Sequence, residues 1–125
     1  MEKPQMSVTD VVQHQVDAYN ARDLERFAAT YADAIRIFRM PSAEPSISGK
    51  VQLAEVYRDR FSAPGLHAEI LARIVLGNKV IDHERVLGIR PEPIEAVAIY
   101  EVCSDLIQNV WFFFPEATST RSAGS

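Results

Sequence analysis

Four consecutive titratable side chains lie between apolar residues in the stretch VIDHERV, residues 80–86. Because successive side chains of a β-strand point to opposite faces, Asp82 and Glu84 share one side of the predicted strand, and His83 and Arg85 share the other. Two carboxyl groups on one buried face can supply an acid and a base, since desolvation and mutual repulsion raise the pKa of one of them. We therefore predict Asp82 and Glu84 as catalytic residues.

Tyr100 and Arg73 decide whether this carboxylate pair can react. The strand register that we predict places Tyr100 opposite Glu84, where its phenol can donate a hydrogen bond to an oxyanion, so Tyr100 is the third predicted catalytic residue. A two-residue hairpin at residues 77–78 pairs Arg73 with Asp82. The alternative interpretation is therefore that Arg73 neutralises Asp82 and that Glu84 only hydrogen-bonds Tyr100. The sequence leaves both interpretations open.

Metal, covalent and cofactor chemistry are not predicted. Consecutive strand residues diverge, so the Asp-His-Glu run is not a set of metal ligands, and the three histidines do not combine with carboxylates at a convincing spacing. The sequence contains no glycine-rich phosphate-binding loop after a strand and no serine or cysteine nucleophile with plausible partners. We expect no metal and no cofactor.

The elements that must position these residues are helices in the first half of the chain and strands in the second. Ser7 or Thr9 can cap a first helix, and Asp23 can cap a second one in which Leu24 and Tyr31 lie on the apolar face. The predicted helices cover about 7–20, 23–31 and 50–61, and the predicted strands about 35–38, 66–76, 79–90, 94–103 and 106–114. This order predicts one α+β domain, residues 1–125, in which helices cover one face of a curved antiparallel sheet. The core spans about 7–114, and residues 115–125 form a flexible tail.

Three stretches resemble the nuclear transport factor two-like superfamily, in its SnoaL-like and ketosteroid isomerase-like branches. They are YNARDLERF (19–27), YADAIRI (31–37) and EPSISG (44–49), followed by the last four strands. The resemblance covers about residues 7–114 and implies a cone in which three helices pack on the concave face of the sheet and enclose an apolar pocket. It also implies a homodimer and reactions that range from isomerisation to cyclisation and epoxide hydrolysis.

The catalytic positions of the ketosteroid isomerases are altered in this sequence. Their tyrosine, general base and oxyanion-hole aspartate correspond to Gln15, Arg39 and about Tyr100. The aspartate–arginine–aspartate pattern of limonene epoxide hydrolases is not matched either, because its position on the last strand is occupied by Phe112. Arginine cannot accept a proton at neutral pH, so the isomerase proton shuttle is absent in its family form. The residues predicted to bind the substrate are Gln15, Arg39, Tyr57, His67, Arg73 and Phe112.

The resemblance also assigns the two faces of the sheet. The concave, pocket-facing side is predicted to carry His67, Glu69, Leu71, Arg73, Val80, Asp82, Glu84, Val86, Ala98, Tyr100 and Val102. The convex side then carries an apolar surface that is too large to leave exposed in a monomer, which predicts a homodimer. That surface consists of Ile70, Ile74, Ile81 and Leu87.

Charge and cysteine content narrow the partners and the location. The formal net charge of −4 and the absence of a lysine or arginine run predict no nucleic-acid or membrane partner. A single cysteine, Cys103, cannot form an internal disulfide, and the first residues lack the pattern of a secretory signal. We predict a cytoplasmic protein that performs cofactor-free isomerase, lyase or hydrolase chemistry on a small hydrophobic carbonyl compound. The alternative is a noncatalytic small-molecule-binding or dimerisation module.

Overall fold

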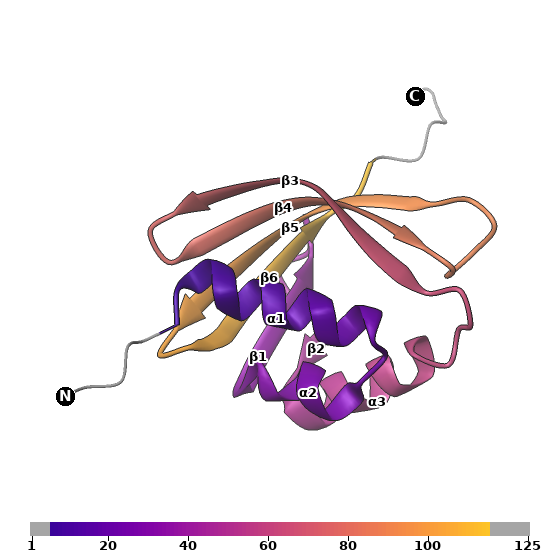
Figure 1. Ribbon diagram of the computed structural model, residues 1–125. Helices are drawn as coiled ribbons and strands as arrows, with labels where there is room; N and C mark the ends of the chain where they lie inside the picture. Colours follow the sequence, from indigo (N-terminus) through magenta and orange to yellow (C-terminus); the bar gives the residue numbers. More distant parts are fainter. Residues whose placement is uncertain (1–5, 116–125) are drawn as a thin grey trace.

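The computed structural model describes residues 6–115, which form three helices and a six-stranded curved sheet that does not close into a barrel (Figure 1). The helices lie on the concave side of the sheet, so the predicted α+β fold is confirmed. The helices are α1 (Val8–Asn20), α2 (Leu24–Ala29) and α3 (Lys50–Arg60). The strands are β1 (Tyr31–Arg39), β2 (Ile47–Ser48), β3 (His67–Leu76), β4 (Lys79–Leu87), β5 (Ile94–Cys103) and β6 (Leu106–Phe113), in the sheet order β2-β1-β6-β5-β4-β3.

Side-chain caps fix the start of the first two helices. The Ser7 hydroxyl accepts a hydrogen bond from the Asp10 amide at 3.0 Å, and the Asp23 carboxylate accepts one from the Arg26 amide at 3.2 Å. Both caps agree with the sequence analysis. The second helix ends earlier than predicted, so Tyr31 is the first residue of β1 rather than part of a helix face.

The sheet is mixed rather than wholly antiparallel. Strands β3 to β6 form the predicted antiparallel meander, but β1 runs parallel to β6, with Ile37 opposite Val110 and Phe38 opposite Trp111. No hairpin links β1 to β6, so their relative direction is set by the path of the whole chain rather than by a local turn.

A β-bulge in β3 changes the predicted alternation of that strand. The pairing with β4 shifts between Ile70 and Ala72, so that Ile70, and not Leu71, lies opposite Glu84. The extra residue exchanges the two faces for the part of the strand that precedes it. Ile70 therefore belongs to the concave side and leaves the predicted convex surface, while Leu71 is exposed.

The same bulge turns His67 and Glu69 away from the interior. Both side chains are exposed, whereas Ala68 between them is buried. The carboxamide of Asn20 holds Ala68 in place, because its nitrogen donates to the Ala68 carbonyl at 3.0 Å and its oxygen accepts from the Ala68 amide at 2.7 Å. The predicted position of His67 on the concave face is therefore wrong: His67 pairs with Leu87 and its side chain is exposed.

The register between β4 and β5 also differs from the prediction. Tyr100 lies opposite Val80 and not opposite Glu84. Lys79 then lies opposite Glu101, with the ammonium nitrogen 3.3 Å from a carboxylate oxygen, a favourable pair that the predicted register does not contain. Because Val80 and Glu84 are an even number of positions apart, this shift leaves every side chain of β5 on its predicted face.

The last part of the predicted β4 does not form. The strand ends at Leu87 because Gly88 adopts a φ of +92°, and a Cβ there would overlap the backbone of Gly65. The predicted tail lies outside the described residues except for residue 115. Within residues 6–115, no helix is both long and apolar enough to cross a membrane.

Candidate functional site

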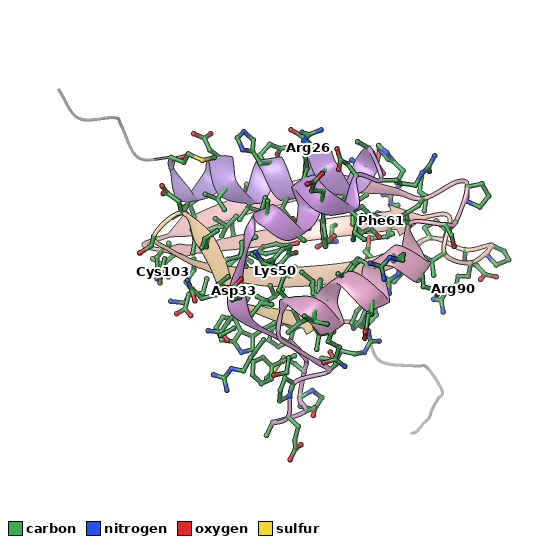
Figure 2. All side chains as sticks on the ribbon, turned by 90° about the horizontal axis from the view of Figure 1, so that it is seen from below. Arg26, Asp33, Lys50, Phe61, Arg90 and Cys103 are labelled. Atoms are coloured by element: carbon green, nitrogen blue, oxygen red, sulfur yellow. The ribbon has the colours of Figure 1, made fainter. Side chains whose placement is uncertain are left out.

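A cluster of polar side chains is buried between the helices and the concave face of the sheet. Gln15, Asp82 and Glu84 are the buried polar or charged residues of the described region, and their surroundings are otherwise tyrosine rings and aliphatic side chains. Figure 2 shows side chains filling the space between helices and sheet. We call the following residues the interior cluster: Gln15 from α1, Tyr31 from β1, Tyr57 from α3, Asp82 and Glu84 from β4, and Tyr100 from β5.

Asp82 is held in a two-pronged ion pair with Arg73 of the neighbouring strand. Its side chain has 0% exposure, and its two oxygens accept from Arg73 Nε at 2.6 Å and Nη2 at 2.9 Å. The third nitrogen of the guanidinium, Nη1, donates to Gln13 Oε1 on α1 at 2.9 Å. The predicted pairing of Arg73 with Asp82 is confirmed, so the charge of Asp82 is compensated and its oxygens are occupied.

Glu84 is buried on the same face, but no cation among residues 6–115 forms an ion pair with it. It is 7% exposed, and its contact in the cluster is the Tyr100 hydroxyl, 3.5 Å from Oε2. Burial, and next the negative charge of Asp82, raise the pKa of Glu84 to about 7, while the Tyr100 hydroxyl and Arg73 act in the opposite direction. At neutral pH the carboxyl group therefore exists in both protonation states, as a proton-transfer group requires.

The tyrosines around Glu84 keep their protons. Burial, with the nearby Glu84 charge as a further cause, raises the pKa of Tyr100 and of Tyr31 well above the ordinary value of a phenol. Burial raises the pKa of Tyr57 as well. These hydroxyl groups are therefore neutral hydrogen-bond donors at any physiological pH, which suits them to stabilise negative charge on an oxygen.

Gln15 places a carboxamide in the interior cluster beside Tyr31. Its side chain is 6% exposed, and among the described residues no group donates to its Oε1. The predicted position of Gln15 in the enclosed space is thus observed, although the cluster uses only part of its hydrogen-bonding capacity.

The other residues predicted to bind a substrate lie on the edge of the cluster or away from it. Tyr57 is buried among aromatic rings, 4.7 Å from Phe27 between ring centroids. Phe112 is half-buried, packs against the core and stacks on Phe114 at 6.0 Å. Arg39 is exposed, with its guanidinium carbon 4.3 Å from the centre of the Phe114 ring. It lies at the rim of the sheet, so it is available only to a ligand that extends there.

Two residues of the site were missed by the sequence analysis. Tyr31 is 2% exposed and faces Glu84, but its sequence position was assigned to the preceding helix. Gln13 contacts Arg73 from α1, at a helix position next to the buried Val12. A polar residue that borders the apolar stripe of a helix could have suggested this role, because such a side chain reaches the edge of the core.

Two hollows in the surface of the described residues lie elsewhere. One, of about 230 Å³, is lined by His83, Glu95 and Phe113 on the convex side. The other, of about 380 Å³, is lined by residues that include His14 and Arg26. Neither is bordered by the interior cluster, whose side chains pack against one another; the apolar pocket stays a prediction.

Comparison with known proteins gives a family and a fold. Residues 12–110 match the model of a family described as the SnoaL-like domain. A search of curated proteins finds no match.

Several solved structures share the fold at low sequence identity. A cystatin-fold protein from Novosphingobium aromaticivorans is 25% identical, with a TM-score of 0.77 over 86% of this chain and 98% of the other. A proposed ketosteroid isomerase from Kribbella flavida is 21% identical, with a TM-score of 0.75 over 93% and 83% of the two chains. An LEH-like epoxide hydrolase from M. tuberculosis is 16% identical, with a TM-score of 0.71 over 86% and 82%.

Proposed function

The chain belongs to the SnoaL-like domain family, and on that premise we propose that it performs general acid–base chemistry on a small hydrophobic carbonyl compound without a cofactor. Isomerase, lyase and hydrolase reactions all fit this description. The structural neighbours named as an isomerase and as an epoxide hydrolase support a proposal of this breadth, because they place different chemistries on one fold.

The observation that carries the proposal is the difference between the two buried carboxyl groups. Asp82 is bound by Arg73 on both oxygens, whereas Glu84 faces a tyrosine hydroxyl and has a pKa of about 7. A group with a pKa near the working pH transfers protons most effectively. Glu84 is therefore the proton carrier, and the negative charge of Asp82 supports it by raising the pKa of Glu84.

The proposed proton transfer involves one acid–base group and one oxyanion donor. Ionised Glu84 removes a proton from a carbon next to the substrate carbonyl, and the Tyr100 hydroxyl donates to the oxygen on which negative charge develops. The protonated Glu84 then returns the proton to carbon or to a leaving group. The carboxylates thus act in separate roles rather than as an interchangeable pair.

Exchange of carbon-bound hydrogen tests this proposal without knowledge of the natural substrate. We expect the wild type to accelerate deuterium uptake at the α-carbon of acetophenone, measured by proton NMR in D₂O on the methyl signal. Glu84→Gln cannot accept a proton and should lower that rate by about 100-fold or more, a usual loss for a general base.

Glu55→Gln is the matched control, because it makes the same chemical change on the exposed side of α3. Its exchange rate should equal that of the wild type. An equal rate in Glu84→Gln would remove Glu84 from the proposal, and an absence of catalysed exchange in the wild type would contradict the proposed acid–base function.

A noncatalytic small-molecule-binding module is the second candidate. The closed packing of the interior cluster favours it, because a binding protein needs no access for rapid turnover and its polar groups need only orient a ligand. This candidate predicts ligand binding that Glu84→Gln preserves, together with no catalysed exchange.

We also propose that a second copy of the chain covers the convex face. Five apolar side chains on five adjacent strands form a row across this face, with Ile74 63% exposed at one end and the others half-buried. We call the row the convex belt: Ile74, Ile81, Ile99, Trp111 and Phe38. A continuous apolar row of this kind supports association of two copies.

A cytoplasmic location is also proposed, because the sequence contains a single cysteine, Cys103, and therefore no internal disulfide.

A further inference from the structure

One acceptor in the interior cluster has no donor. Gln15 Oε1 is buried, and no group of the described residues donates to it. Buried polar atoms are almost always hydrogen-bonded, because an unmet acceptor has lost its contacts with water without replacement. An acceptor left unmet next to a proposed proton-transfer group therefore suggests a ligand.

The donors that lie around the two buried carboxyl groups are already engaged. All three nitrogens of Arg73 donate, two to Asp82 and one to Gln13. The Tyr100 hydroxyl is directed to Glu84. The hydroxyl of Tyr31 lies beside the Gln15 carboxamide, but no hydrogen bond from it or from any other described residue reaches Gln15 Oε1.

A second buried oxygen without a partner shows the contrast. Asn109 Oδ1 belongs to a half-buried side chain, whose nitrogen donates to Glu101 at 2.8 Å. Asn109 lies opposite Glu101 on the convex side of the sheet, next to the half-buried ion pair of Lys79 and Glu101. Gln15, in contrast, is enclosed with a carboxyl group and tyrosine hydroxyls, which are the groups that a polar ligand would need.

We propose that Gln15 Oε1 accepts a hydrogen bond from a hydroxyl group of the ligand, and that the substrates are hydroxy-substituted carbonyl compounds. The inference rests on the proposed function and specifies its substrate class. The carbonyl oxygen lies at Tyr100 on the sheet, the carbon next to the carbonyl lies at Glu84, and the hydroxyl group lies at Gln15 on α1.

A neutral hydroxyl fits this position better than an ammonium group. The surroundings are aromatic and aliphatic: Tyr19 and Phe27 have ring centroids 6.0 Å apart, and Tyr57 lies 4.7 Å from Phe27. A charged donor would have to lose its water in these surroundings, which costs more free energy than burial of a neutral hydroxyl. Burial of a planar alcohol or phenol costs less desolvation free energy.

Three matched compounds test the inference by binding alone: 4-hydroxyacetophenone, 4-methoxyacetophenone and acetophenone. Their dissociation constants are measured by NMR titration with the wild type, Gln15→Met and Gln15→Glu. Gln108→Met serves as the control, because Gln108 lies on β6 next to the β5–β6 turn and contacts only the Cys103 carbonyl there. Amide spectra of each variant establish that it is folded.

We expect the wild type and Gln108→Met to bind the phenol at least about tenfold more tightly than the ether or acetophenone. Gln15→Met should remove this preference and leave the affinity for acetophenone unchanged, whereas Gln15→Glu, which keeps an oxygen acceptor, should retain it. Equal affinities in the wild type, a preference that survives in Gln15→Met, or no binding of any compound would overturn the inference.

The result is separable from the test of the proposed function. A phenol preference that depends on Gln15, together with no catalysed hydrogen exchange, would support the ligand class and contradict only the catalysis. Catalysed exchange that depends on Glu84, without a phenol preference, would do the reverse.

Discussion

The two faces of β4 carry neighbouring titratable residues in very different surroundings. On the concave face, Asp82 is fully buried and bound to Arg73 at 2.6 Å. On the convex face, His83 lies 3.5 Å from Glu95, and its side chain is 44% exposed. Charges interact strongly where water is excluded and weakly where it is present. One strand therefore carries buried carboxyl groups on one side and solvent-exposed charged side chains around an apolar surface on the other.

The difference also separates the two interpretations that the sequence left open. Arg73 compensates Asp82, as the less reactive interpretation required, but it does not bind Glu84. The carboxyl that remains is the one that can exchange a proton near neutral pH. The comparison of the two faces is therefore tested by changing one ion pair on each.

The largest expected effect is on the buried pair. Arg73→Met leaves Asp82 without a partner inside the protein and should lower the free energy of unfolding by about 3–5 kcal/mol, measured by urea denaturation. Arg85→Met removes the exposed pair with Glu69, whose atoms are 3.6 Å apart, and should cost less than about 1 kcal/mol.

Both variants and the wild type are compared at one protein concentration, because a dimer adds to the measured stability. Similar losses in the two variants would contradict the contrast between the faces. If Arg73→Met lowered the free energy of unfolding only slightly, another group would have to compensate the charge of Asp82.

The next effect is on the pH dependence of stability. The pKa of Glu84 is raised from 4.5 to about 7 in the folded protein. Between these pH values the folded protein keeps a proton that the unfolded chain loses, so stability falls as the pH rises. Glu84→Gln does not titrate, and its stability relative to the wild type should increase by about 3 kcal/mol across this window.

Denaturation of both proteins at about pH 4 and about pH 8 measures this difference. Glu55→Gln replaces an exposed carboxyl group and should show no such gain in stability. Parallel pH curves for the wild type and Glu84→Gln would show that Glu84 titrates normally.

The smallest effect concerns the convex belt. Ile74→Asp places a charge in the proposed dimer interface and should raise the dissociation constant of the dimer at least about tenfold, or about 1.4 kcal/mol, measured by analytical ultracentrifugation. Val51→Asp is the control, since Val51 is 77% exposed on α3 and away from the belt. A monomeric wild type, or equal dissociation in both variants, would contradict the proposed homodimer.

Local rules predicted much of the fold. The caps at Ser7 and Asp23, the Gly77-Asn78 hairpin and the pairing of Arg73 with Asp82 all follow from interactions between residues near in sequence. The parallel pairing of β1 with β6 did not follow from any local rule, because these strands are far apart in the chain.

The sequence predicted which face of β4 carries the site, but not the detailed arrangement of the residues around it. Alternation along β4 placed Asp82 and Glu84 on one face, and the family resemblance correctly assigned that face to the concave side. The bulge in β3 that turns His67 outward, and the contact of Ala68 with Asn20, 48 positions away in the sequence, cannot be anticipated from alternation alone. Arg73 binds Asp82 and not Glu84, and burial raises the pKa of Glu84. Both facts depend on distances and burial that only the structure provides.

The titration of Glu84 tests the central claim most directly. The side-chain carboxyl carbon of Glu84 is followed by carbon-detected NMR as the pH changes, with Glu84→Gln used to assign its signal. A midpoint near pH 7 is the predicted result. A midpoint near the ordinary value of about 4.3 would contradict the assignment of Glu84 as the proton carrier.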